Sequence, residues 1–245
     1  MYAKPEIEFT DTELIPWQPV AGRSGAYEKI LSLDPESGDY TRIIYSQPDL
    51  NEALRNYDHP AGERLEHEIC EEVFIWKGGI IDSILGETFG DWFYACRPPH
   101  MPHGPLFHPP GCFSVENRYL ASRRTKPEIE FTDTRLIPWK PVEGRKGAYE
   151  KILSLDPVNG DYTRLIYSQP DIYDAINDLH HPKAEILEHD IWEEVFILKG
   201  TIVDVTLGQT FGEGFYACRP PHMPHGPLYH PTGCVSLEFR YRTPK

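Results

Sequence analysis

The chain has 245 residues, of which 40% are hydrophobic and 25% are charged, proportions that suit a folded protein with a substantial core. Its formal net charge of −14 is unfavourable for a nucleic acid or an anionic membrane as partner. The N-terminal segment lacks the apolar run of a signal peptide, no window approaches the about 18 apolar residues of a membrane span, and the cysteines have no CxxC spacing, so we expect a cytoplasmic protein.

An internal repeat organises the chain. Most positions in the first half recur in the second half without a gap, at a constant shift of 122 residues, as from Lys4 to Lys126. We therefore expect two domains, residues 1–123 and 124–245. Three segments show the repeat best: KPEIEFTDT begins at Lys4 and Lys126, GAYEKILSLDP at Gly25 and Gly147, and FYACRPPHMPHGPL at Phe93 and Phe215.

Strand patterns dominate each copy. Residues 25–46 form two β-rich runs around a Ser-Gly turn, which becomes Asn159-Gly160 in the second copy, a favoured hairpin turn. Residues 51–63 are polar and differ between the copies, so we expect a surface loop there with room for one short helix. Further strands are expected over residues 88–97 and 112–119. Many short strands separated by Gly and Pro turns predict an all-β sandwich or jelly roll.

The segment EEVFIWKGGIID predicts a strand that ends in a turn at its Lys-Gly pair. Val73 and Ile75 lie on one face of this strand, and Phe74 and Trp76 lie on the other. A strand that is apolar on both faces must be covered on both. We expect one face to line a barrel interior and the other to pack on the sister copy or on another subunit.

His67 and Glu71 lie four residues apart on a predicted strand, so both share the interior face with Leu65, Ile69, Val73 and Ile75. A histidine and a carboxylate directed into an apolar interior need compensation for lost hydration. A metal ion supplies it, because neutral imidazole and carboxylate oxygens are ordinary metal ligands. The second copy repeats the pair as His189 and Glu193.

A histidine cluster follows in the segment RPPHMPHGPLFH. It places His100, His103 and His108 within nine residues, and prolines on both sides stiffen the turn that carries them. Hydrogen-bonded turn histidines are the alternative, but three so close together favour a functional role for at least one. The second copy has His222, His225 and His230 at these positions.

Together these segments resemble the two sequence motifs of the cupin superfamily. The first motif reads His67-x-x-x-Glu71-Glu72-Val73-Phe74-x-x-x-Gly78, and the second reads Pro98-Pro99-x-x-x-His103. The resemblance covers residues 25–119 and 147–241 and is closest to the cupin domain of ChrR anti-sigma factors and to acetylacetone-cleaving enzymes. It implies a bicupin: two tandem cupin barrels, each a double-stranded β-helix of the jelly-roll kind.

The resemblance also implies one divalent metal ion in each copy. The implied ligands are His67, Glu71 and His103 in the first copy and His189, Glu193 and His225 in the second. The chain departs from the family pattern twice in each copy: Leu65 and Leu187 stand where the first motif begins with histidine, and His100 and His222 stand where the second often has glycine. Three outcomes stay open: a two-histidine, one-carboxylate site, a site completed by His100, or a pocket without metal.

Other residues are assigned to substrate chemistry. Arg97 could clamp a substrate carboxylate, with a structural salt bridge to Glu116 as an equal alternative. His100 is the candidate for moving a proton, and Tyr94, which is more often a core residue at such a position, and His108 complete the expected pocket. The corresponding residues of the second copy are Arg219, with Glu238 as the salt-bridge alternative, His222, Tyr216 and His230.

The favoured function is a metal-dependent bicupin enzyme that acts on a small anionic or carbonyl-containing molecule as a non-haem Fe(II) dioxygenase. The alternatives are a metal-dependent hydrolase or isomerase of the same fold and a non-catalytic ligand-sensing cupin, because a shared fold does not fix function. Fe(II) is the favoured cofactor, with Zn, Ni, Mn or no metal as alternatives. We expect a small-molecule substrate, packing between the two repeats, and no nucleic acid or membrane partner; a homo-oligomer is compatible with this.

Overall fold

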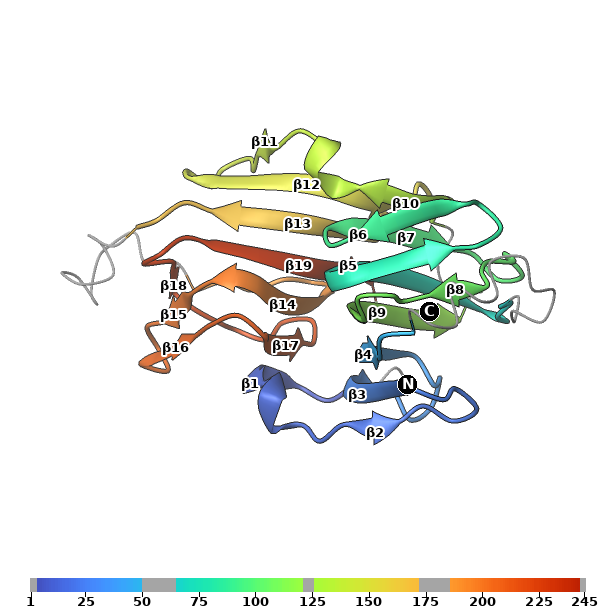
Figure 1. The fold of residues 1–245 in the computed structure, drawn as a ribbon. Helices are drawn as coiled ribbons and strands as arrows, with labels where there is room; N and C mark the ends of the chain where they lie inside the picture. Colours follow the sequence, from blue (N-terminus) through green and yellow to red (C-terminus); the bar gives the residue numbers. More distant parts are fainter. Residues whose placement is uncertain (1–3, 50–64, 121–125, 172–185, 243–245) are drawn as a thin grey trace. The chain divides into compact units, whose positions relative to one another are not determined.

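The computed structural model describes residues 4–49, 65–120, 126–171 and 186–242. The polar segment 51–63, expected to be a loop, lies outside these residues. The chain divides into two compact units. Unit 1 consists mainly of Ile15–Ile137, and unit 2 consists of Tyr2–Leu14, Pro138–Leu155 and Asn159–Lys245. The described residues are almost entirely strands and turns, which confirms the predicted all-β class (Figure 1).

Unit 1 contains a sheet with the strand order β10-β7-β5-β9-β4-β3-β2, and β6 and β8 pair with β5 outside this path. All of these strand pairs are antiparallel. The elements are β2 (Gln18–Pro19), β3 (Ala26–Leu33), β4 (Tyr40–Ser46), β5 (Ile69–Asp82), β6 (Glu87–Gly90), β7 (Phe93–Arg97), β8 (Leu106–Phe107), β9 (Cys112–Leu120), β10 (Ile129–Asp133) and a 3-10 turn, η3 (Thr134–Leu136).

Unit 2 repeats this arrangement with the order β1-β17-β14-β19-β13-β12-β11 and a smaller sheet, β16-β15-β18. Its elements are β1 (Ile7–Asp11), the 3-10 turn η1 (Thr12–Leu14), β11 (Lys140–Pro141), β12 (Ala148–Leu155), β13 (Tyr162–Ser168), β14 (Trp192–Gly200), β15 (Ile202–Asp204), β16 (Gln209–Phe211), β17 (Phe215–Arg219), β18 (Leu228–Tyr229) and β19 (Cys234–Tyr241).

The predicted hairpin at the start of each copy is confirmed. Strands β3 and β4 pair antiparallel from Ala26↔Ser46 to Leu33↔Tyr40. The turn between them closes with a hydrogen bond of 2.8 Å from the amide of Asp34 to the carbonyl of Asp39. Gly38 has φ +76, a left-handed value that favours glycine at this point of the turn.

The strand that carries Glu71 continues beyond its expected end. In unit 1, the register of β5 against β9 shifts between Ile75 and Lys77, and the strand runs on through Gly78, where φ is +94, and only ends at Asp82. A Cβ atom at Gly78 would lie 2.1 Å from the carbonyl oxygen of Gly111, so only glycine fits this crossing. The Lys-Gly pair therefore bends the strand from the main sheet toward β6 and β8 instead of ending it. In unit 2 the same bend separates β14 from β15.

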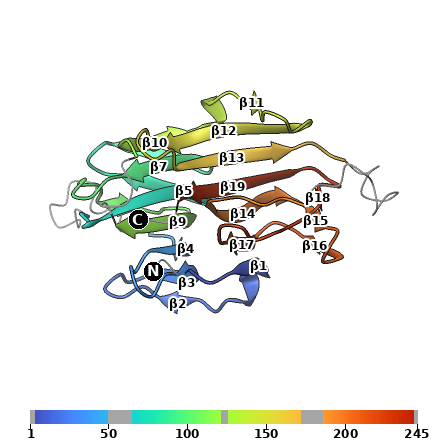
Figure 2. The same ribbon diagram turned by 180° about the vertical axis from the view of Figure 1, so that it is seen from behind.

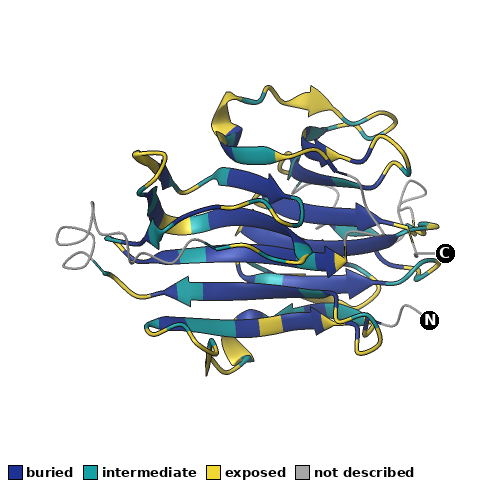
Figure 3. Ribbon diagram, turned by 90° about the vertical axis from the view of Figure 1, so that its right-hand side faces the viewer, coloured by how far each residue is buried: buried dark blue, intermediate teal, exposed yellow. Residues whose placement is uncertain are grey.

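Both faces of β5 are buried, as its sequence predicts. Val73 and Ile75 belong to a core cluster with Ala95 of β7 and Phe131 of β10. On the opposite face, Phe74 is 1% exposed. Figure 3 shows that buried residues follow the strands while exposed ones gather mainly at turns. The structure thus places the inward face of β5 in a closed core, next to the site described below.

The first strand of each repeat belongs to the unit formed by the other repeat. Strand β1 lies antiparallel to β17 in unit 2, and β10 lies antiparallel to β7 in unit 1 (Figures 1 and 2). Phe9 of β1 stacks on Phe211 at 4.6 Å, and Phe131 of β10 stacks on Phe89 at 4.7 Å. The compact units therefore differ from the expected boundary at 123/124. The period of the repeat does not reveal this, because two nearly identical strands fit either sheet edge.

Among the residues that the structure describes, no helix is long and apolar enough to cross a membrane. All five cysteines are free and buried.

Candidate metal centre

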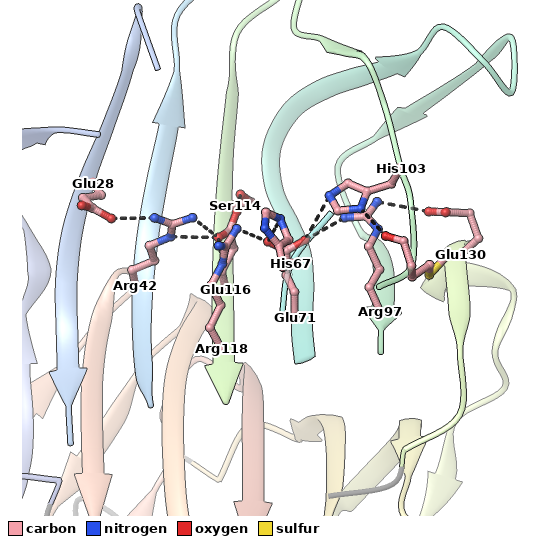
Figure 4. A network of polar contacts seen from close by, with 11 residues as sticks. Glu28, Arg42, His67, Glu71, Arg97, His103, Ser114, Glu116, Arg118 and Glu130 are labelled. Carbon is pink, nitrogen blue, oxygen red and sulfur yellow. Dashed lines mark hydrogen bonds and ion pairs between the residues drawn. The ribbon is translucent and has the colours of Figure 1, made fainter. Parts of the chain in front are cut away.

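His67, Glu71 and His103 meet at one point in unit 1. Glu71 lies on β5, His67 lies just before it, and His103 lies between β7 and β8. Backbone hydrogen bonds of 2.8 and 3.0 Å between Leu65 and His103 hold the two segments together. One ligand atom from each of the three side chains lies within 4.8 Å of the others (Figure 4). The same grouping forms in unit 2 from His189, Glu193 and His225.

Hydrogen bonding directs a free nitrogen of His103 into this site. Its Nδ1 lies 3.0 Å from the carbonyl oxygen of Met101, to which Nδ1–H donates when the imidazole is neutral, and its Nε2 lies 3.7 Å from Glu71 Oε2. Burial lowers the pKa of His103 and of His67, which favours the neutral, metal-binding form of each. His225 repeats the contact with the carbonyl of Met223 at 3.0 Å, and burial lowers its pKa as well.

Two arginines hold the central carboxylate. Arg97 Nη1 lies 3.1 Å from Oε2 of Glu71, and Nη2 of Arg118 donates to Oε1. Burial alone would raise the pKa of Glu71, but the charges of Arg118 and Arg97 outweigh burial and hold it well below its usual value. Glu71 is therefore a carboxylate throughout the neutral pH range. Glu193 is held in the same way by Arg240 and by Arg219, whose Nη1 lies 2.8 Å away.

The carboxylate belongs to a longer row of alternating charges. In unit 1 the row contains three guanidinium groups and four carboxylates, so it carries one excess negative charge. Each arginine lies between two glutamates: Arg42 between Glu28 and Glu116, Arg118 between Glu116 and Glu71, and Arg97 between Glu71 and Glu130 (Figure 4). In unit 2 the row runs through Glu150, Arg164, Glu238, Arg240, Glu193, Arg219 and Glu8.

The donor set fits a divalent metal ion. The Nε2 atoms of His67, His189 and His225 are buried and have no hydrogen-bond partner, which is costly unless a ligand satisfies them. Each pocket has a volume of about 30 Å³, enough for an ion with a water molecule. His67, Glu71 and His103, and their counterparts in unit 2, are therefore the residues that would hold the ion.

The structure does not bring His100 or His222 into the pockets. Both have a positive φ at the tip of the Pro-Pro turn, 62° and 66°, which turns the side chains outward, where they are 60% and 70% exposed. His100 Nδ1 faces Glu66 at 3.3 Å and its Nε2 faces Glu68 at 3.4 Å. The expected proton-transfer role and the alternative in which His100 completes the metal site have no support from this geometry.

The remaining predicted residues divide between pocket and core. Arg97 and His108 line the pocket of unit 1, and Arg219 and His230 line that of unit 2. Arg97 is ion-paired to Glu71 and Glu130, not to Glu116 as expected, because Arg42 and Arg118 occupy Glu116. Tyr94 and Tyr216 lie outside the pockets: their hydroxyls donate to Glu72 at 2.6 Å and to Glu194 at 2.5 Å on the opposite face of the strand.

Of the inward polar residues of β9, the sequence indicated only Glu116, and only as a salt-bridge partner. Ser114, Glu116 and Arg118 alternate along this strand and all line the pocket. Their spacing of two residues, repeated in β19 as Ser236, Glu238 and Arg240, is the signal that could have found them, since polar side chains on the inner face of a barrel strand need partners. Cys112, at the start of β9, also lines the pocket, but burial raises its pKa to about 12, so its thiol stays protonated.

Comparison with known proteins shows which folds resemble this one. No protein-family model matches the chain. No curated protein matches it either. Among solved structures, a provisionally assigned dioxygenase from Nostoc punctiforme matches with TM-score 0.72 and 16% identity over 96% of this chain and 82% of the other. A cupin 2 conserved barrel domain protein from Leptotrichia buccalis matches with TM-score 0.57 and 12% identity over 98% of both chains.

A third match is HEPD from Streptomyces albus, solved with its substrate 2-hydroxyethylphosphonate and Fe(II) bound. Its TM-score is 0.65 at 8% identity, over 98% of this chain and 76% of the other. Identities this low establish the fold and nothing beyond it. The chain is thus an all-β protein with the jelly-roll barrels of the cupin fold.

Proposed function

We propose that this chain is a bicupin enzyme in which each barrel binds one divalent metal ion and acts on a small organic molecule. The observation that carries the proposal is the meeting of two imidazoles and one carboxylate, formed independently in both units. Two histidines and a carboxylate are the ligand set of non-haem Fe(II) oxygenases, which keep open positions for substrate and O₂. A dioxygenase that uses Fe(II) is therefore the version we favour.

The surrounding residues suit this role. The Met101 carbonyl fixes the tautomer of His103, and such outer contacts orient metal-bound histidines. Arg97 and Arg118 hold Glu71 ionised, so the carboxylate is ready to bind without losing a proton. The side chain of Leu65, which stands where the cupin pattern has another histidine, lines the pocket and leaves one more position for substrate. The fold likeness to an Fe(II)-containing structure is compatible with this proposal.

Metal analysis tests the proposal. Protein purified without chelator and reconstituted with Fe(II) under anaerobic conditions should hold about two ions per chain, one for each group of ligands. His67→Ala and His189→Ala should each remove about one ion, and the double variant should remove both. His100→Ala is the matched control, because this exposed histidine should leave the metal content unchanged. Unchanged metal content in the His67 and His189 variants would overturn the ligand assignment.

Oxygen dependence separates the two enzyme classes that such a site serves. A dioxygenase consumes O₂ in proportion to product and stops under strict anaerobiosis. A hydrolase or isomerase would polarise a carbonyl or activate water with the same ion and would continue without oxygen. Substrate screening of the Fe(II)-loaded protein with an oxygen electrode therefore decides between them.

A further inference from the structure

Arg23 lies at the pocket of unit 1 on the turn between β2 and β3. The turn is closed by hydrogen bonds from the Val20 amide to the Ala26 carbonyl (2.9 Å) and from the Arg23 amide to the Val20 carbonyl (3.2 Å). Gly22 and Gly25, with φ of +75 and +73, allow the chain to turn on both sides of the arginine. The position of Arg23 is therefore set by the backbone.

The second repeat builds the same turn around Arg145. The amide of Val142 donates to the carbonyl of Ala148 at 2.9 Å, and the amide of Arg145 donates to that of Val142 at 3.2 Å. Gly144 and Gly147 again have positive φ, +73 and +79. Arg145 lines the pocket of unit 2 as Arg23 lines that of unit 1.

Arg23 differs from the other two arginines that line its pocket. Arg97 and Arg118 are each paired to two glutamates. Arg23 is half-buried and has no ion-pair or side-chain hydrogen-bond partner among the residues that the structure describes. Arg145 has the same status in unit 2, beside the paired Arg219 and Arg240. A guanidinium that lines a pocket without a partner is available for a ligand.

Charge balance points to the kind of ligand. The row from Glu28 to Glu130 carries one excess negative charge, which Arg23 offsets, so the charges of the row and of Arg23 together sum to zero. A divalent ion on His67, Glu71 and His103 would leave two positive charges uncompensated. Such a pocket favours an anion over a neutral molecule. The guanidinium fork matches a carboxylate, which it can bind through two parallel hydrogen bonds.

We propose that Arg23 and Arg145 are substrate-binding residues that each take the carboxylate of a small organic anion whose other end reaches the metal centre. The second half of this statement rests on the proposed function, whereas carboxylate binding by the arginine does not. The small pocket, about 30 Å³, favours a short ligand, and an oxygen at the end that reaches the metal would suit it, so the class is a short hydroxy or oxo acid. Arg97, with both neighbouring carboxylates engaged, positions Glu71 and does not bind this ligand.

The test is binding of glycolate to the full chain by calorimetry, with ethylene glycol as the uncharged probe. The wild-type protein should bind glycolate, and ethylene glycol should not bind. The double variant Arg23→Gln/Arg145→Gln should weaken glycolate binding by about tenfold or more. Arg135→Gln removes an arginine that is paired to Asp133 outside the pocket, and it should bind like the wild type. Equal glycolate affinity in the wild type and the double variant, or no binding to the wild type, would overturn the proposal.

Metal content, measured on the same samples, keeps this test separate from that of the metal centre. The arginine variants should retain the wild-type metal content, since neither residue belongs to the ligand groups. Arginine-dependent glycolate binding by a protein that takes up no metal on reconstitution would support the anion site and count against the metal proposal. Loss of metal in the double variant would show that the arginines act on the centre itself and would contradict a substrate-binding role.

Discussion

Nη1 of Arg97 lies 3.1 Å from Oε2 of Glu71, and both side chains are almost completely buried. The carboxylate expected to bind metal is therefore also part of an ion-pair network. The same carboxylate links β5 to β7 through Arg97 and would also bind the metal ion. Stability and metal binding are accordingly coupled at this residue.

Glu71→Gln should lower both properties. The variant leaves Arg97 and Arg118 buried with one fewer carboxylate, and breaking a buried pair in this way costs about 3 kcal/mol. Urea unfolding of metal-free protein measures the loss, and metal analysis should show that about one ion per chain is missing. Glu66→Gln, on an exposed glutamate, is the control for both measurements. A stable variant with full metal content would refute the coupling.

Stability of the metal-free protein should fall on mild acidification. Burial lowers the pKa of His67 and His103 from the usual 6.5, so the folded state takes up fewer protons than the unfolded state below that pH. The stability linked to these neutral imidazoles is complete above pH 6.5 and is lost as the pH falls from 6.5 toward the lowered values. Urea titrations between pH 8 and 5 measure this, and His103→Asn should flatten the curve. A variant with the same pH profile as the wild type would contradict the assignment.

Gly78→Ala should destabilise unit 1 strongly. The added methyl group would lie 2.1 Å from the carbonyl oxygen of Gly111 in a backbone that already has φ +94, and we expect a loss of about 4 kcal/mol or more. Gly38→Ala is the matched control, because it has a similar φ of +76 and nothing within 4 Å, so it should cost only about 1–2 kcal/mol. Thermal unfolding distinguishes the two. Equal costs would show that backbone conformation alone requires glycine at Gly78.

Phe131→Ala should weaken unit 1, although Phe131 belongs to the second repeat. Removing this ring opens a cavity beside Val73 and Phe89, at a cost of about 3–5 kcal/mol. Hydrogen exchange should rise mainly in β5, β7 and β9. The partner variant Phe9→Ala should instead raise exchange in β14, β17 and β19. Each variant is the control for the other. If Phe131→Ala raised exchange in unit 2 and Phe9→Ala raised it in unit 1, the placement of β10 in unit 1 and of β1 in unit 2 would be wrong.

Sequence reasoning anticipated the centre better than its surroundings. His67, Glu71 and His103 could be named from two motifs because β-strand alternation and a stiff Pro-Pro turn determine where such side chains point. The structure places His67 just before the strand and not on it, but the three side chains still meet. Residue spacing gave no such guidance for His100, whose positive φ directs the side chain outward.

The network around Glu71 could not be derived in the same way. Arg118 and Glu116 are brought to Glu71 by pairing between β5 and β9, which are separated in the chain by three short strands, β6, β7 and β8. The unpartnered state of Arg23 depends on which carboxylates the other arginines occupy, and that is a property of the whole pocket. Strand exchange is invisible for a related reason: two nearly identical segments are interchangeable until the fold assigns them to different sheets.

The exchange of β1 and β10 has a consequence for how the gene can change. Glu130 contacts Arg97, and Glu8 contacts Arg219. Each pocket therefore depends on a residue that is encoded in the other repeat. A mutation at Glu130, for example, lies in the second repeat but acts on the pocket of unit 1. The two halves cannot diverge as independent genes would.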